Sequence, residues 1–156
     1  LAEYNGKPVT YIAHQAFRDK TIKKIVMPTG ITDLGGLVFQ DCRELEYVDM
    51  RGVTYISYAN KDGDGNAKRS DGSVESNNNF RFCNSLATVI VGNGYSSETG
   101  QFNSDHTHGV VNLYVYGTST VTTHPDDKIL TGNVYYYSDT KKAGAWHFAD
   151  GAATLW

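Results

Sequence analysis

The sequence predicts a solenoid in which short parallel strands stack along one face and irregular or 3-10 turns form the other. Val, Ile, Thr, Tyr, Phe and Trp together supply 54 of the 156 residues, and β-branched and aromatic side chains favour strands over helices. Apolar residues also recur with a period of about 22 residues. A unit of that length buries its apolar side only by stacking on neighbouring units.

Three apolar frames define the repeat. They run from Val9 to Met27, from Ile31 to Met50 and from Val53 to Val91. The first two frames are offset by 22 residues before Lys20 and by 23 after it. In the third frame the offset grows to 41 residues from Phe80 onward, which predicts an inserted loop near residues 57–79.

Two looser frames follow toward the C-terminus. One contains Val110, Leu113 and Val115, and the other contains Leu130, Val134 and Tyr136. We therefore expect one solenoid domain over residues 1–156, with roughly 4–5 coils and a second inserted loop near 92–109. Residues near 138–156 are expected to form a C-terminal cap, in which Trp146, Phe148 and Trp156 cover the last coil.

The two cysteines occupy equivalent positions of the second and third frames. Cys42 and Cys83 are therefore expected to be buried, reduced and neighbouring, as small side chains in a ladder of equivalent sites. A disulfide between neighbouring coils is also sterically conceivable. A catalytic or metal-binding thiol would need an electropositive setting, and no His, Lys or Arg recurs beside both sites.

Charge and hydropathy exclude some classes of protein. The net charge is −3, and no run of Lys and Arg exceeds two residues, which disfavours nucleic-acid binding through phosphate contacts. No apolar run approaches the roughly 18 residues of a transmembrane helix, so no membrane insertion is expected in this segment. The first residue is Leu1, which suggests a mature or trimmed piece of a longer protein.

The repeat pattern also resembles a known family. The residues are Ile12-x3-Ala16-Phe17, then Ile22-x2-Ile25-x-Met27-Pro28, then Ile31-x2-Leu34-x3-Val38-Phe39-x2-Cys42-x2-Leu45-x2-Val48. This pattern resembles the BspA-type leucine-rich repeat family of bacterial surface and secreted proteins. The resemblance implies a strand-dominated α/β leucine-rich repeat solenoid, an extracellular or cell-surface location and a role in adhesion.

Two short motifs contain residue types that can bind a metal ion. Asp62, Asp64 and Asn66 place oxygen ligands at the alternate positions that open a calcium loop, although a solvated Gly-rich loop fits the same residues. His106 and His108 form His-x-His, with Asp105 and His124 as further ligands for zinc or copper. Surface histidines in an inserted loop explain that motif as well, so we expect neither a metal nor a cofactor.

Tyrosines gather on one face of the predicted sheet. Residues that alternate with the inward-facing ones should point to the open side, and they include Tyr47, Tyr114, Tyr116, Tyr135 and Tyr137. We expect the last four to be at least partly exposed as an aromatic patch on adjacent coils. Such a patch fits a ligand-binding surface, and it fits equally well cross-strand packing that stabilises the terminal coils.

The sequence contains no recognisable catalytic motif. The leading hypothesis is a non-enzymatic recognition or adhesion module that binds a host or microbial protein or glycan through the sheet face. The alternatives are a metal-dependent enzyme that uses His106 and His108, and a structural spacer without a ligand.

Overall fold

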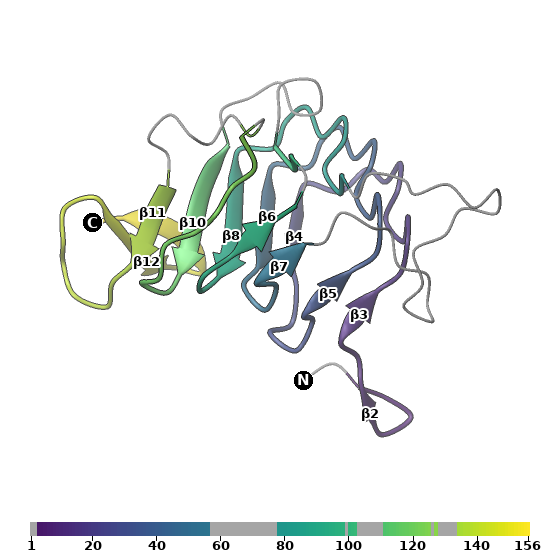
Figure 1. The fold of residues 1–156 in the computed structure, drawn as a ribbon, viewed down its shortest axis with the longest axis horizontal. Coiled ribbons are helices and arrows are strands. Elements are labelled where there is room, and N and C mark those ends of the chain that lie inside the picture. The colour runs from purple at the N-terminus through teal and green to yellow at the C-terminus, as the bar shows by residue number, and fades with distance from the viewer. Residues whose placement is uncertain (1–2, 57–77, 99, 103–110, 126, 128–133) are drawn as a thin grey trace.

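The computed structural model describes residues 3–56, 78–98, 100–102, 111–125, 127 and 134–156 (Figure 1). Within these ranges the chain forms strands and turns, and it contains no helix that could cross a membrane. The strands are β1 (Glu3–Tyr4), β2 (Lys7–Pro8), β3 (Tyr11–Ile12), β4 (Lys24–Val26), β5 (Asp33–Leu34), β6 (Tyr47–Met50), β7 (Tyr55–Ile56), β8 (Thr88–Gly92), β9 (Ser96–Ser97), β10 (Asn112–Tyr116), β11 (Val134–Tyr137), β12 (Ala145–Ala149) and β13 (Ala152–Leu155).

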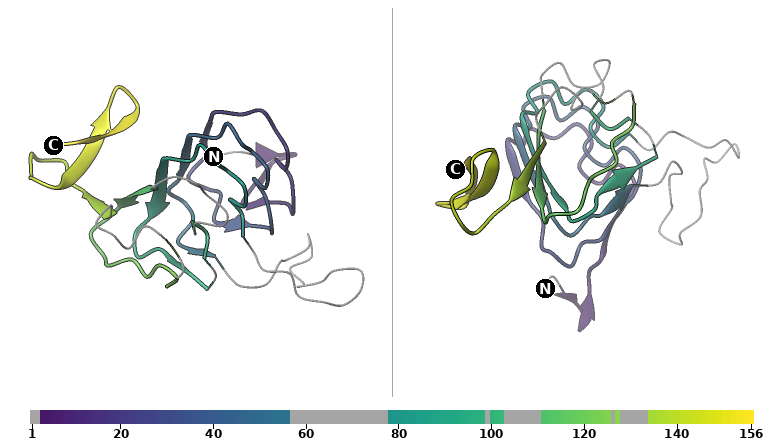
Figure 2. Two further views of the ribbon diagram at one scale, coloured as in Figure 1. Left: turned by 90° about the horizontal axis from the view of Figure 1, so that it is seen from above. Right: turned by 60° about the vertical axis from the view of Figure 1, so that its left-hand side comes forward.

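A seven-stranded mixed sheet dominates the fold. Its strand order is β13-β12-β11-β10-β8-β6-β4, with parallel pairing from β4 to β12 and an antiparallel pair between β12 and β13. The sheet curves as a half-barrel around one side of the core, and the short parallel pairs β3–β5 and β7–β9 lie on the other side (Figure 2). The small β1–β2 hairpin extends away from this body (Figure 1).

The predicted fold class is wrong. The chain is not the α/β leucine-rich repeat solenoid that the resemblance implied, because the described residues are all strand and turn and the main sheet is not parallel throughout. The segments around Ala16 and Val38 are turns, on the face that was expected to be irregular or 3-10. The last two strands reverse direction because Asp150 and Gly151 form a two-residue loop with φ of 51° and 75°, the geometry of a type I′ hairpin.

The residue offsets between the apolar frames are nevertheless confirmed by the strand pairing. Ile25 pairs with Val48, and Val48 pairs with Val89. Val89 then pairs with Leu113, and Leu113 pairs with Val134. The sequence pattern therefore identified which strands are neighbours, although the fold class drawn from it was incorrect.

Four stacked phenylalanines run through the core beside the turns. The ring centroids of Phe17, Phe39, Phe80 and Phe102 follow one another at 5.6, 5.5 and 5.3 Å. Phe102 and Tyr95, from the segment expected to be an inserted loop near 92–109, are fully buried. Three buried side-chain oxygens also accept hydrogen bonds from backbone N–H groups, at 2.7–3.0 Å. Asn79 accepts from Val38, Gln101 accepts from Asn79, and Asp127 accepts from Phe102.

Both cysteines are buried and free, as expected from their equivalent positions. The Cys42 thiol donates to the carbonyl oxygen of Phe17 at 2.9 Å, and the Cys83 thiol donates to that of Phe39 at 3.1 Å. Burial raises the pKa of both thiols above the ordinary value. These side chains therefore have a structural role, since reactivity needs an accessible thiolate.

This burial predicts that neither cysteine reacts with DTNB at pH 8 while the protein is folded. The reason is that the thiolate is the reacting species, and burial disfavours it. Absorbance at the thionitrobenzoate band should show no release in buffer and release of both equivalents in denaturant. Prompt labelling of the native protein would contradict the buried thiol ladder.

Candidate functional site

The tyrosines predicted to share one face of the sheet do share it. Tyr47, Tyr114, Tyr135 and Tyr137 contact a cluster on the outer face that is separate from the main core. Their sequence neighbours Val115 and Tyr136 contact the main core instead. The alternation of side chains along β10 and β11 therefore has the predicted orientation.

The C-terminal hairpin of β12 and β13 packs onto this outer face (Figure 2). Trp146 is 0% exposed, and its ring lies edge-on to Tyr114 at 5.5 Å and to Tyr137 at 5.3 Å. Its Nε1 donates to the carbonyl oxygen of Val115 at 3.0 Å. Trp146 therefore forms the centre of a second apolar cluster on the side of the sheet that was expected to be open.

The expectation that all four tyrosines are at least partly exposed is therefore wrong for Tyr114. It is only 8% exposed, because Trp146 covers it and Tyr135 stacks on it at 5.3 Å. Tyr135 and Tyr137 are half-buried, as is Tyr47 farther along the sheet. Tyr116 is 41% exposed, so it is the most accessible of the four tyrosines.

Arg51 lies beside these accessible rings. Its guanidinium is 4.3 Å from the ring centroid of Phe148 and 5.2 Å from that of Tyr116. The Asp49 carboxylate, 1% exposed, holds the guanidinium through Nε at 3.0 Å and through a second, shorter contact. This hydrogen bonding raises the pKa of Arg51 above its ordinary value, so the side chain stays charged.

We call Tyr116, Tyr137, Phe148 and Arg51 the aromatic surface. Tyr116 contacts Tyr137 at 4.9 Å and Phe148 at 6.1 Å. Tyr137 also lines an adjoining hollow of about 320 Å³, whose other lining residues are Thr118, Tyr136, Ser138, Lys142, Ala143, Gly144 and Ala145. A ring cluster next to a hollow can accept an inserted side chain.

Sequence reasoning missed two members of the aromatic surface. Phe148 was assigned to a cap over the last coil, together with Trp146 and Trp156. Trp156 instead stacks on His147 at 3.7 Å and donates its indole N–H to the carbonyl oxygen of Ser138 at 2.9 Å. The dipeptide Asp150-Gly151 was the available signal for a hairpin. Side chains on one face of a strand are two residues apart, and Arg51 lies two residues after Asp49. The sequence could therefore have placed Arg51 on the same outer face as Asp49.

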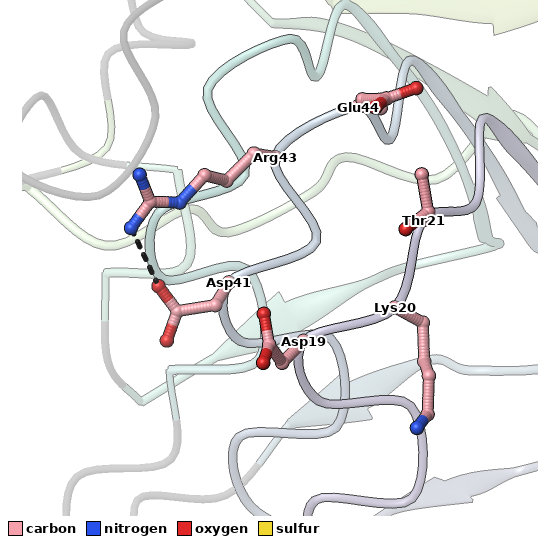
Figure 3. Close-up of a pocket in the computed structure, with 6 residues that line it drawn as sticks. All are labelled: Asp19, Lys20, Thr21, Asp41, Arg43 and Glu44. Atoms are coloured by element: carbon pink, nitrogen blue, oxygen red, sulfur yellow. Dashed lines mark ion pairs between the residues drawn. The ribbon is translucent and has the colours of Figure 1, made fainter.

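A second hollow lies on the turn side of the molecule (Figure 3). Its volume is about 180 Å³, and Asp19, Lys20, Thr21, Asp41, Arg43 and Glu44 line it. Asp19 and Asp41 hold equivalent left-handed turn positions, with φ of 57° and 62°. Arg43 reaches Asp41 at 3.6 Å but is itself 71% exposed, and an ion pair so exposed contributes little rigidity.

Most metal-ligand candidates lie outside the described residues. This holds for Asp62, Asp64, Asn66, His106 and His108. Among the residues that the structure describes, no three His, Cys, Asp or Glu side chains are grouped to hold a metal ion. Asp127 instead accepts the backbone N–H groups of Phe102 at 2.7 Å and His124 at 3.1 Å, so this buried carboxylate stabilises a turn.

The fold and the site together define an all-β protein with a curved mixed sheet and an aromatic surface on its convex side. Comparison with family models, with curated proteins and with solved structures gives no match to this chain.

Proposed function

We propose that this chain is a non-enzymatic recognition module that binds a partner protein through the aromatic surface. The observation that carries the proposal is the position of Tyr116. Its ring is 41% exposed and lies between Tyr137, Phe148 and the guanidinium of Arg51. Tyr and Arg are enriched among the residues that dominate protein–protein binding energy.

The surroundings of Tyr116 favour binding because they are fixed before the partner arrives. Arg51 is held by the buried Asp49. The buried ring of Trp146 packs against the rings of Tyr137 and Phe148, with centroid distances of 5.3 and 4.9 Å. Ordering a flexible side chain at an interface costs about 0.5–1.5 kcal/mol. A surface that is ordered in advance avoids much of this cost.

The arrangement favours a protein over a glycan. A sugar stacks on an open aromatic face, but Arg51 lies over the faces of Phe148 and Tyr116. The rings of Tyr116 and Tyr137 are also inclined by 53° to each other, so they offer no common plane. The partly exposed ring of Tyr116 and the hollow beside Tyr137 suit apolar and polar side chains of a polypeptide.

The test is direct binding to arrays of purified matrix proteins, purified bacterial surface proteins and glycans. For a protein captured by the wild type, Tyr116→Ser should weaken binding by at least about tenfold, the scale of a hot-spot residue. Tyr116→Ser should leave thermal unfolding nearly unchanged, since this ring is among the more exposed ones. Tyr4→Ser is the matched control, because Tyr4 is an exposed tyrosine on the distant β1–β2 hairpin.

Two results would contradict the proposal. One is a captured protein that binds the Tyr116→Ser variant as tightly as the wild type. The other is binding confined to the glycan array, which would assign the surface to carbohydrate.

A further inference from the structure

The N-terminal end of the main sheet presents an unpaired edge. β4 is the outermost strand of that sheet and β3 is the outermost strand of the β3–β5 pair, and both lie at the same end of the molecule (Figure 1). Phe17 at this end is the last ring of the phenylalanine stack, and it is 36% exposed. No described strand pairs with the outer side of either β3 or β4.

Apolar side chains at this end are exposed because no further described strand covers them. Ile12 and Ile25 are only half-buried, whereas their paired counterparts Leu34 and Val48 in the next layer are buried. Val26, on the outer face of β4, is 55% exposed. β3 and β4 therefore carry apolar side chains that pack against a described neighbouring strand on one side only.

The backbone N–H and carbonyl groups of β4 point alternately to its two edges, one paired with β6 and one open. The carbonyl oxygen of Lys23 and the N–H of Met27 bond to β6, and in a parallel ladder alternate residues bond to the same neighbour. The N–H and carbonyl groups of Lys24 and Val26 therefore point to the open edge. An edge of this kind can accept an added strand.

The N-terminal segment, which contains β4, carries a charge opposite to that of the rest of the chain. Residues 1–27 contain five basic residues and two acidic ones, which gives a net charge of +3, whereas residues 28–156 contain nine basic and fifteen acidic ones, which gives −6. The five basic residues are all exposed: Lys7, Arg18, Lys20, Lys23 and Lys24. Lysines on an edge strand also oppose pairing with an identical edge, so a second copy of this chain is a poor occupant.

We propose that the β4 edge binds an extended acidic segment of a partner protein by strand addition. The backbone groups of Lys24 and Val26 supply the hydrogen bonds, and the exposed apolar layer receives the apolar side chains. Lys23 selects acidic residues, together with Lys24, whose Nζ lies 4.6 Å from the ring centroid of Tyr47 in the free protein. In strand order this edge is at the opposite end of the sheet from β13, and it shares no residue with the aromatic surface.

The probe is a capped peptide with the sequence of residues 44–50, Glu-Leu-Glu-Tyr-Val-Asp-Met. It is acidic, its last four residues form β6 in this protein, and Tyr47–Asp49 pair with the edge of β4 that faces β6. Two companion peptides replace the three acidic residues by Gln or by Lys. Fluorescence anisotropy with the folded protein should show binding of the acidic peptide that weakens as salt is added, and at least about tenfold weaker binding of the Lys peptide.

Two variants of the protein separate charge from strand addition. Val26→Pro removes the outward N–H but no hydrogen bond to β6, so the fold should persist and peptide binding should fall by at least about tenfold. Val26→Thr is its matched control, because it keeps the N–H and should bind normally. The double variant Lys23→Glu, Lys24→Glu should reverse the preference between the acidic and Lys peptides.

The proposal is overturned if Val26→Pro binds the acidic peptide as the wild type does, or if all three peptides bind equally. Dimers of the free protein in sedimentation equilibrium that Val26→Pro abolishes would assign the edge to a second copy. Strong protection of the Lys24 and Val26 amides from hydrogen exchange in the natural full-length protein would show that its own chain covers the edge. Both results would exclude the acidic partner, while the proposed role of the aromatic surface would stand.

Discussion

Replacing Trp146 with Ala should lower the free energy of unfolding by about 3–5 kcal/mol, the scale for truncating a large buried aromatic side chain. Trp146 has no exposed surface, and its ring contacts Tyr114, Tyr137 and Phe148 at 5.5, 5.3 and 4.9 Å. Its indole N–H also satisfies the carbonyl oxygen of Val115. The substitution leaves a cavity between the hairpin and the sheet, and it leaves that acceptor without its donor.

Urea denaturation followed by far-UV circular dichroism measures this loss. Trp146→Phe should recover part of it, because the ring remains while the hydrogen bond is lost. Phe148→Ala should cost less than Trp146→Ala, since Phe148 is only half-buried. A loss below about 1 kcal/mol for Trp146→Ala would show that the hairpin does not hold the outer cluster together.

Phe39→Ala is the second substitution with a large expected effect, again about 3–5 kcal/mol. Phe39 is fully buried, and its ring is stacked between Phe17 and Phe80 at 5.6 and 5.5 Å. Its removal interrupts the stack in the middle. Most of the resulting cavity should persist, because the two neighbouring rings belong to other turns of the chain.

Phe17→Ala provides the matched comparison for Phe39→Ala. Phe17 makes one stacking contact within the same series but lies at its exposed end, so its truncation should cost clearly less. The two unfolding curves, measured under the same conditions, test whether the stack is a continuous core. Equal costs for the two variants would contradict that interpretation.

The strand pairing was predictable because it depends on a local pattern that repeats. A shift of one residue would turn Leu113 and Val115 away from the core and turn Tyr114 inward, so the apolar alternation specifies both neighbours and faces. This explains why the equivalence of Val48 with Val89 and the orientation of Tyr114 were correct. The same physics placed Cys42 and Cys83 in buried turn positions.

The covering of the outer face was not predictable from that pattern. Whether Trp146 caps the end of the stack or folds over the sheet depends on the direction that the chain takes after β11, and residues 138–144 carry no periodicity. Once the Asp150-Gly151 loop reverses the chain, β13 pairs antiparallel, which is inconsistent with an all-parallel sheet. The exposure of Tyr114 therefore depended on Trp146, which lies in a different element much later in the sequence.

Arg51 shows a second limit of sequence reasoning. A charged residue just after a strand normally indicates a solvated turn, and nothing in the local pattern marks it as part of a ring cluster. Its position depends on the buried carboxylate of Asp49 and on Phe148, which arrives from the C-terminal hairpin. The aromatic surface is therefore assembled from four separate parts of the chain: the end of β6, β10, β11 and β12.

The hairpin also determines what an optical probe of this protein reports. The chain has two tryptophans, and both belong to this C-terminal element, one in β12 and the other directly after β13. Intrinsic tryptophan fluorescence is therefore a selective reporter of hairpin docking, whereas circular dichroism follows the sheet as a whole. During synthesis on a ribosome, the strands from β4 to β11 are made before either tryptophan, so tryptophan emission appears only once the sequence of the hairpin has been added.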